Sequence, residues 1–175
     1  MEKSGKTIWI IDPAHSEINF KVRHMMISTV SGHFEKFDAR VETNGEDFAN
    51  AHVELEVDIS SINTKNKDRD THLRSTDFFD AEQHPKMTFV SKNYDGEKLT
   101  GDLTIRGTTR EVELDVEFNG IAVDPYGQTK AGFEITGEIN RKDFGLNWNA
   151  VTEAGNVVVS DKVKLVIEAQ FIKQA

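Results

Sequence analysis

Residues 51–60 read AHVELEVDIS, and this stretch decides the fold class. Its apolar side chains recur at every second position: Ala51, Val53, Leu55, Val57 and Ile59. The positions between them carry polar or charged side chains: His52, Glu54, Glu56, Asp58 and Ser60. Because successive side chains of a β-strand point to opposite faces, this period of two predicts a strand with one dry face and one wet face.

The same alternation recurs along most of the chain. It is regular at residues 111–118 and 163–171, and less regular at residues 16–24, 32–41, 85–91, 98–105 and 131–139. Turn sequences separate many of these segments: Asn44-Gly45, Asp95-Gly96, Asn119-Gly120 and Pro125-Tyr126-Gly127. Asn-Gly and Asp-Gly favour the positive φ angles of tight hairpin turns. About eight short strands at this spacing predict one all-β domain over residues 1–175, an antiparallel sandwich or barrel.

Composition excludes several classes of protein. The 175 residues include 30 Asp and Glu against 21 Lys and Arg, so the net charge is -9. Because an acidic surface repels phosphate backbones, we expect no nucleic-acid partner. The absence of cysteine excludes disulfides, thiolate metal sites and thiol nucleophiles. No apolar run has the length of a signal peptide core or a membrane span, so we expect a cytoplasmic protein without an integral membrane segment.

Residues 62–84 form the longest interruption of the strand pattern. They contain NTKNKDRDTHLRSTDFF (residues 63–79), in which charged side chains precede two phenylalanines. A connection of this length is uncommon in a compact all-β domain and is often functional. We expect a short helical or loop segment near residues 65–80, folded over the barrel and anchored to the core by Leu73, Phe78 and Phe79.

Residue spacing indicates neither a catalytic nor a metal centre. His15 and Ser16 are adjacent, and adjacent strand residues point to opposite faces, so they do not form a nucleophile–base pair. The six histidines form no HxH or HExxH motif, and Asp70 with His72 supplies only two potential ligands. We therefore expect no metal and no other cofactor.

His24 is a polar residue on an apolar face. It shares parity with Ile18, Phe20 and Val22, so its side chain is expected to point toward the interior. A polar group there needs a hydrogen-bond partner. Two interpretations remain open: a core histidine bonded within the barrel, or a polar contact at the mouth of a cavity.

Carboxylates for acid–base chemistry would need an inward, desolvated position. Most Asp and Glu residues alternate outward, and the exceptions are Asp70, Asp77 and Asp143. Arg74 and Arg106 could pair with these carboxylates, either as structural ion pairs at a barrel end or as a site for an anionic head group.

The interior itself has two interpretations. The inward set predicted by parity is Phe20, Val22, Val53, Leu55, Phe89, Leu103, Leu114, Val116, Phe133 and Ile135. A barrel of about eight strands can be filled by such side chains or can enclose a ligand cavity, and hydrophobicity does not distinguish the two. Residues 141–149, RKDFGLNWN, break the alternation; their aromatic residues Phe144 and Trp148 either pack at a bulged hairpin end or form the rim of an opening.

Several stretches together resemble the YceI-like family. They are WIIDPAHSEINFKVRHMMISTVSGHFEKF (9–37), SSINTKNKDRDTHLRSTDFFDAEQHPKMTFVS (60–91), GDLTIRGTTREVELDV (101–116), and GFEITGEINRKDFGLNWN (132–149) followed by VKLVIEA (163–169). The resemblance implies a lipocalin-like antiparallel β-barrel with a long apolar cavity. It implies binding of isoprenoid chains, such as polyprenyl pyrophosphates and quinone precursors, or of other long-chain amphiphiles, and it attaches no catalytic reaction.

Particular residues carry this resemblance: His24, Asp70, His72, Leu73, Arg74, Asp77, Phe78, Phe79, Arg106, Gly107, Arg141, Asp143, Phe144, Gly145 and Trp148. Many members of the family are exported, whereas this sequence shows no export signal, which suggests a ligand in the cytoplasm or inner leaflet. The resemblance is also compatible with a homodimer.

The leading hypothesis is a non-enzymatic barrel that carries or sequesters a long-chain isoprenoid or similar amphiphilic lipid. The expected ligand contacts are Phe20, Val22, His24, Asp70, His72, Arg74, Phe78, Phe79, Phe89, Phe133, Phe144 and Trp148. Of these, His24, Asp70, His72 and Arg74 are the polar groups expected near an opening.

The alternative is an enzyme acting on a lipid or small hydrophobic metabolite, with Asp70, His72 and Asp143 as acid–base groups. A third class is a ligand-free interaction module, which would show a large exposed apolar patch.

Overall fold

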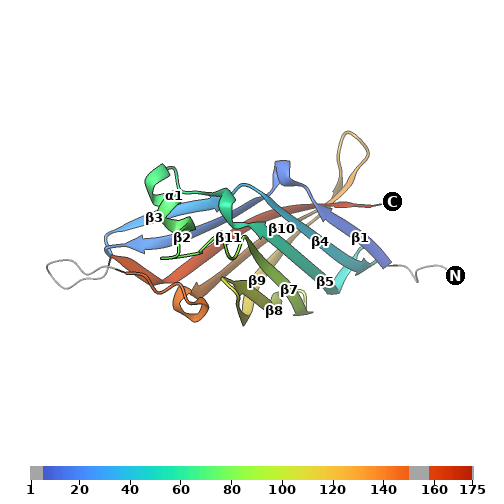
Figure 1. Ribbon diagram of the computed structural model, residues 1–175. Helices are drawn as coiled ribbons and strands as arrows, with labels where there is room; N and C mark the ends of the chain where they lie inside the picture. The colour runs from blue at the N-terminus through green and yellow to red at the C-terminus, as the bar shows by residue number, and fades with distance from the viewer. Residues whose placement is uncertain (1–5, 150–157, 175) are drawn as a thin grey trace.

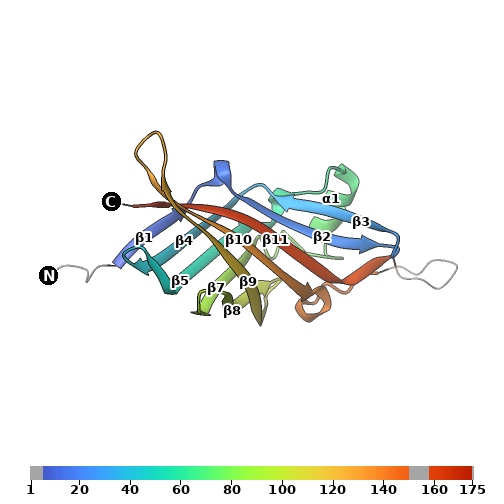
Figure 2. The same ribbon diagram turned by 180° about the vertical axis from the view of Figure 1, so that it is seen from behind.

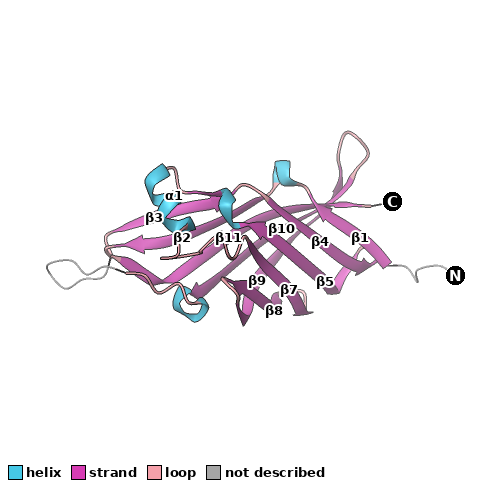
Figure 3. Ribbon diagram, viewed as in Figure 1, coloured by secondary structure: helices cyan, strands magenta, loops and turns pink. Residues whose placement is uncertain are grey.

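The structure is a computed structural model that describes residues 6–149 and 158–174, and strands dominate it (Figure 1, Figure 3). The strands are β1 (Lys6–Ile11), β2 (Glu17–His24), β3 (Ser28–Phe34), β4 (Phe37–Asn44), β5 (Asp47–Asp58), β6 (Ile62–Asn63), β7 (Lys86–Tyr94), β8 (Lys98–Ile105), β9 (Thr108–Val123), β10 (Thr129–Asn140) and β11 (Val159–Lys173). The helical elements are α1 (Lys67–Arg74) and the 3-10 turns η1 (Pro13–His15), η2 (Ile59–Ser61) and η3 (Arg141–Phe144). No helix among these residues is long and apolar enough to span a bilayer.

The antiparallel sheet closes on itself. Its order runs β1-β4-β5-β7-β8-β9-β10-β11, and β11 pairs back onto β1, so eight strands of the described chain form a ring. The predicted β-barrel is therefore confirmed, and the segment near residues 65–80, expected to be helical or a loop, contains the short helix α1.

The barrel has two different ends because β11 changes partner along one edge. Its residues 171–173 pair with β1, whereas its residues 159–168 pair with β2. Beyond β2 follow β3 and the short β6. These three strands and α1 lie toward the end of the barrel opposite the chain termini (Figure 1, Figure 2).

The prediction of one strand over residues 32–41 is wrong. Two strands, β3 and β4, occupy this range and are separated by Glu35 and Lys36. The buried side changes from even positions, such as Phe34, to odd positions, such as Val41. A strand without a bulge cannot change parity, and here the two exposed residues between β3 and β4 absorb the change. The alternation pattern also did not identify β1.

The predicted turn at Asn119-Gly120 is also wrong, because β9 continues through it. In the pairing of β9 with β10, Phe118 lies opposite Phe133 and Gly120 lies opposite Gly132. Asn119 is thus the extra residue of a β-bulge, and Gly120 takes a φ angle of 111°, which favours glycine. The other three predicted turns do connect consecutive strands.

Aromatic side chains fill the barrel near β1. The Trp9 side chain is fully buried, and its Nε1 donates to Thr43 Oγ1 at 2.8 Å. The Phe48 ring centroid lies 4.9 Å from that of Trp9 and 5.1 Å from that of Phe133. Phe133 also packs against Phe171 at 6.0 Å. The hollow among these side chains has a volume of only about 50 Å³. Because so little space is left, this end of the barrel is a packed core.

Candidate functional site

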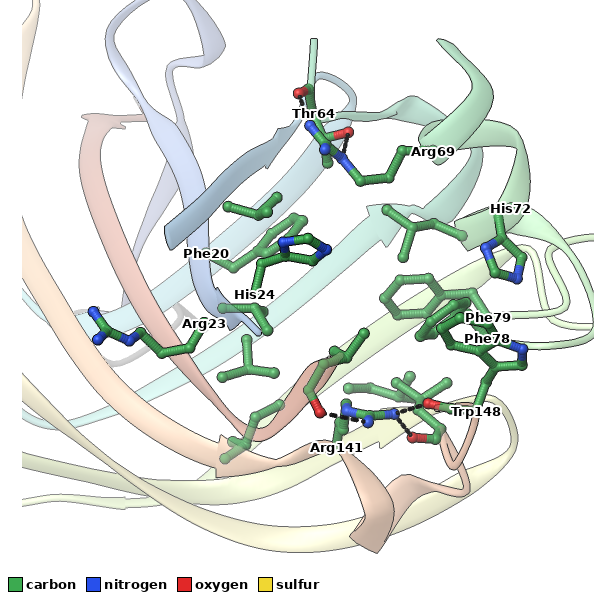
Figure 4. A pocket seen from close by; sticks show the side chains of 18 of the residues that line it. Phe20, Arg23, His24, Thr64, Arg69, His72, Phe78, Phe79, Arg141 and Trp148 are labelled. Carbon is green, nitrogen blue, oxygen red and sulfur yellow. Dashed lines mark hydrogen bonds between the residues drawn. The ribbon is translucent and has the colours of Figure 1, made fainter. Parts of the chain in front are cut away.

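A cavity of about 280 Å³ lies inside the other end of the barrel. In Figure 4, Phe20 and His24 stand on one side of it, and His72, Phe78, Phe79 and Trp148 stand on the other. The remaining lining residues are mostly apolar: Val22, Arg23, Val30, Phe34, Thr64, Arg69, Leu73, Met87, Ile105, Ile139, Arg141, Leu146, Val158, Val159, Val163 and Leu165.

The β2 side of the cavity follows from strand parity. Phe20, Val22 and His24 line the cavity, as their spacing predicts. His24 is half-buried, and its ring has no hydrogen-bond partner among the described residues. Of the two interpretations left open for His24, its position therefore supports the polar group on a cavity wall.

A glycine on β3 leaves room for the ring of Phe20. Gly32 pairs directly with Phe20 across the two strands. A Cβ atom added to Gly32 would come within 2.8 Å of Thr64 Cγ2 and closer still to the Phe20 ring. The missing side chain therefore sets where this part of the cavity wall lies.

Helix α1 forms the opposite side, and a buried carboxylate fixes it. Asn66 caps the helix by accepting a hydrogen bond from the Arg69 N–H. The buried Asp70 accepts hydrogen bonds from the N–H of Thr64 at 2.9 Å and from its hydroxyl. Arg69 Nε and Nη2 donate to the hydroxyl and carbonyl oxygens of the same threonine. These bonds hold α1 so that Leu73 faces the cavity.

His72 joins the helix to an aromatic cluster at the cavity. Its Nε2 lies 2.8 Å from Asp77 Oδ2, and both side chains are partly exposed. Its ring lies edge-on to Trp148 at a centroid distance of 4.7 Å and to Phe78 at 5.1 Å. Phe78 and Trp148 also contact each other at 5.4 Å. Trp148 thus packs against aromatic side chains of α1 and of the segment that follows it, and it lines the cavity, which supports the rim interpretation over packing at a hairpin end.

Arg141 is a buried cation on the cavity wall. Its side chain is 4% exposed, and its Nη1 donates to the carbonyl oxygens of Leu146 at 2.6 Å and Trp148 at 2.8 Å. Its Nε donates to the Ser160 carbonyl at 2.9 Å, while the Asp161 carboxylate is 3.9 Å away. Burial lowers the pKa of Arg141 and Asp161 opposes that change, but a guanidinium stays charged at neutral pH. Its charge is thus compensated mainly by carbonyl dipoles.

The ionisable side chains on the described cavity wall are all basic: Arg23, His24, Arg69, His72 and Arg141. The described lining includes no Asp or Glu, although the chain has 30 of them. The cavity wall is therefore apolar with a basic character, in contrast to the acidic surface of the protein.

Several predicted contacts lie outside this cavity. Asp70 is buried against Thr64, and Arg74 lies on the outer side of α1, where its Nη2 reaches Thr71 Oγ1 at 3.4 Å. The three phenylalanines Phe89, Phe133 and Phe144 belong to the packed core of the barrel. The inward parity predicted for Phe89 and Phe133 is right, whereas Phe144 lies in η3, where strand parity does not apply. Parity cannot indicate which level of a barrel is hollow.

Sequence reasoning missed part of the lining. Val30 was recognisable because it lies opposite Val22 in the β2–β3 pairing. Arg69 carried no such signal, and Arg141 was indicated only by the family resemblance, since its carbonyl partner Ser160 lies 19 residues away and approaches only in the folded chain. Arg106, considered above as a possible partner of a carboxylate, donates to the Phe78 carbonyl at 2.9 Å and ties this segment to the barrel.

The groups of the enzymatic alternative do not converge. Asp70 is occupied by Thr64, His72 lies beside Asp77, and Asp143 is exposed outside the cavity lining. Within residues 6–149 and 158–174, no three His, Asp or Glu side chains are arranged to hold a metal ion.

Known structures share this barrel. A YCEI protein from Campylobacter jejuni superposes with a TM-score of 0.73 at 35% sequence identity, covering 87% of this chain and 90% of that one. A polyisoprenoid binding domain from Saccharophagus degradans superposes with a TM-score of 0.65 over 98% of this chain and 100% of its own. At 16% identity, the second likeness concerns the fold alone.

Sequence relatives extend over the same length. A UPF0312 protein from Staphylococcus epidermidis is 44% identical over 161 residues, which are 91% of this chain and 94% of that protein. The YceI-like domain matches residues 9–171, from the buried Trp9 of β1 to Phe171 of β11. This match includes all or part of every strand of the closed ring and both walls of the cavity, and the chain therefore belongs to the YceI-like family.

Proposed function

We propose that this protein binds a long-chain isoprenoid or a similar amphiphilic lipid and carries or sequesters it without catalysing a reaction. The observation that carries the proposal is the apolar cavity of about 280 Å³ at one end of a barrel whose other end is packed. The polyisoprenoid binding domain from Saccharophagus degradans, which has a similar fold, supports the same class of ligand.

The energetics of such binding divide between tail and head. Burial of an apolar tail gains roughly 25 cal/mol per Å² removed from water, but ordering a flexible chain offsets part of that gain. Selectivity along the tail is therefore loose. The head group then decides the ligand, and a basic wall favours a pyrophosphate or a quinone-like head with hydrogen-bond acceptors over a cationic head.

No acid–base role is proposed for Asp70, His72 or Asp143. The Asp70 carboxylate already accepts two hydrogen bonds from Thr64, and the solvent-exposed Asp143 does not line the cavity. His72 faces the cavity, but its Nε2 is engaged by Asp77. These contacts favour structural roles over proton transfer to a bound ligand.

Solvent extraction of the purified protein followed by mass spectrometry tests the proposal directly. We expect a stoichiometric long-chain isoprenoid or related amphiphile in the extract. After delipidation, geranylgeranyl pyrophosphate should bind more tightly than geranylgeraniol, because only the former carries an anionic head. An empty extract together with no binding of either probe contradicts the proposal.

A matched pair of substitutions on β11 links binding to the cavity. Val163 lines the cavity, whereas Val166 lies on the same strand, is also half-buried and is not part of the lining. Val163→Trp should fill the cavity and reduce the bound lipid, while Val166→Trp should leave the bound lipid unchanged. Circular dichroism and thermal unfolding of both variants establish that each is folded. Equal lipid content in both variants would place the ligand elsewhere.

A further inference from the structure

The turn between β2 and β3 exposes three consecutive apolar side chains. Met25, Met26 and Ile27 are 37%, 57% and 78% exposed, respectively. The turn is closed by the Ile27 N–H, which donates to the His24 carbonyl oxygen at 3.1 Å. Single exposed apolar residues need no explanation, but three together at the tip of a hairpin form a protruding apolar surface.

The backbone of this turn is unusual for its sequence. Met25 and Met26 have φ angles of 52° and 60°, in the left-handed region that favours glycine or asparagine. Hairpin turns of this kind most often contain Asn-Gly. The chain therefore places two large apolar side chains at a tip where turn chemistry alone favours small or polar ones.

The charge around the tip has the opposite sign to the charge of the whole chain. Between Glu17 and Glu35 the hairpin contains no acidic residue, and it carries Lys21 and Arg23, both exposed. Arg23 Nη2 donates to the Met26 carbonyl oxygen at 3.3 Å, which places the guanidinium beside the apolar tip. An apolar tip flanked by cations, on a chain with a net charge of -9, complements an anionic lipid surface.

The tip also lies beside the cavity. Arg23, His24 and Val30, which flank the turn on both strands, line the cavity. The Met25 N–H donates to the carbonyl of Val158, another lining residue, at 2.8 Å. In Figure 1 the β2–β3 turn lies at one end of the molecule, and the β9–β10 turn and the chain termini lie toward the other.

We propose that Met25, Met26 and Ile27 insert into the interface of an anionic lipid bilayer, with Lys21 and Arg23 contacting its head groups. Docked in this way, the protein presents the lipid cavity to the membrane, so that an amphiphile can pass between them. The role of the docking surface in lipid exchange rests on the proposed lipid-binding function, whereas the docking itself does not.

Vesicle co-sedimentation of the full chain tests the docking surface. The probes are vesicles of phosphatidylcholine alone and vesicles in which about one third is phosphatidylglycerol, an anionic lipid. The test variant combines Met25→Asn, Met26→Gly and Ile27→Thr, which supplies the residues that the turn prefers and should preserve the fold. The control variant combines Val123→Thr and Tyr126→Ser, which removes exposed apolar side chains at the β9–β10 turn.

We expect the wild type and the control variant to bind the anionic vesicles, with less binding to phosphatidylcholine or at high salt. The test variant should bind at least about tenfold more weakly. Equal vesicle binding by the test variant and the wild type, or no binding by the wild type, overturns the docking proposal. Lipid content is measured on the same samples. Retained lipid in a wild type that does not bind vesicles refutes docking alone, while vesicle binding without any bound lipid refutes the cavity function alone.

Discussion

At the scale of single residues, the shape of the cavity depends on Gly32 having no Cβ atom. Gly32 lies opposite Phe20, and an added Cβ would overlap the Phe20 ring. Gly32→Ala should push this ring out of place, lower the free energy of unfolding by about 1–3 kcal/mol and reduce bound lipid. Gly132→Ala is the matched control, since its added Cβ meets only Asn119 Cβ at 3.7 Å. Denaturant unfolding and lipid extraction measure both effects; identical results for the two variants would contradict the role of Gly32.

A second residue-scale prediction concerns acid stability. Burial opposes ionisation of Asp12, but hydrogen bonds from His15, Lys130 and the Ala14 N–H together lower its pKa below 3.8. A lowered folded-state pKa stabilises the fold above the unfolded-state pKa and loses this contribution as the pH falls through the folded-state value. Asp12→Asn should therefore have a lower free energy of unfolding than the wild type at pH 7. Below about pH 4 the difference in unfolding free energy between the two should shrink. Thermal unfolding across this pH range measures the difference; a gap that widens in acid contradicts it.

Residue-scale prediction succeeded where strand parity alone decides direction. His24 faces the cavity because it lies on β2 with the parity of Phe20. Parity says nothing about Arg141, whose position depends on carbonyl groups in segments 5 to 19 residues away. A side chain that is held by irregular backbone cannot be placed until that backbone is folded.

At the scale of secondary-structure elements, the Asp70 carboxylate is the central acceptor of the hydrogen bonds that hold α1 in place. Asp70→Ala removes both hydrogen bonds between this carboxylate and Thr64, so the buried N–H of Thr64 loses its acceptor. Bonds to a charged group are each worth about 1.5–3 kcal/mol, so the variant should lose roughly this much or more of its unfolding free energy. Asp68→Ala, on the exposed side of the same helix, should change stability by about 0.5 kcal/mol or less.

Urea denaturation compares these two variants, and lipid extraction shows whether the cavity wall is kept. Asp70→Asn retains an acceptor and should lie between Asp70→Ala and the wild type. If Asp70→Ala and Asp68→Ala had the same small effect, the contact with Thr64 would not anchor the helix. If Asp70→Asn alone kept full stability but lost all function, the acid–base alternative would regain support.

Element boundaries were predictable only where alternation continued without a change of phase. The regular alternation of β5 identified a strand and its buried face correctly. At Glu35 and Lys36 the parity change marks the end of β3. In the sequence alone, however, these polar residues look like ordinary solvent-facing positions within a strand, so the boundary is hidden. Asn119-Gly120 has the residue types of a tight turn. However, β9 pairs with β10 both before and after these residues, so the strand continues through them as a bulge.

At the scale of the whole molecule, the sequence could predict a barrel but not where it is hollow. The inward faces of both ends carry similar apolar residues, so composition does not separate the packed end around Trp9 from the cavity end around Phe20. The difference arises from topology: β11 pairs with β1 at one end and with β2 at the other. Such a change of partner is a long-range property that local patterning does not record.

The two ends should therefore respond differently when ligand is removed. Binding to the folded state alone stabilises it by RT ln(1 + [L]/Kd), about 2.7 kcal/mol at a hundredfold excess of free ligand over Kd. The ligand's contacts form at the cavity wall. Amide hydrogen exchange through local opening should therefore slow most in α1 and at those ends of β2 and β3 that line the cavity. Strands β1 and β4 around Trp9 should change least.

Hydrogen–deuterium exchange of delipidated protein, with and without geranylgeranyl pyrophosphate, measures this distribution. Peptides from α1 and the β2–β3 hairpin are expected to gain protection, whereas peptides from β1 and β4 serve as internal references. Protection confined to β1 and β4 would place the ligand in the packed end, against the cavity assignment. The difference between the two ends is expected because a local opening at the packed end leaves the ligand bound, so amide exchange through that opening keeps its rate. Amides of the cavity wall exchange through openings that break contacts with the ligand, and these openings become rarer when the ligand is bound.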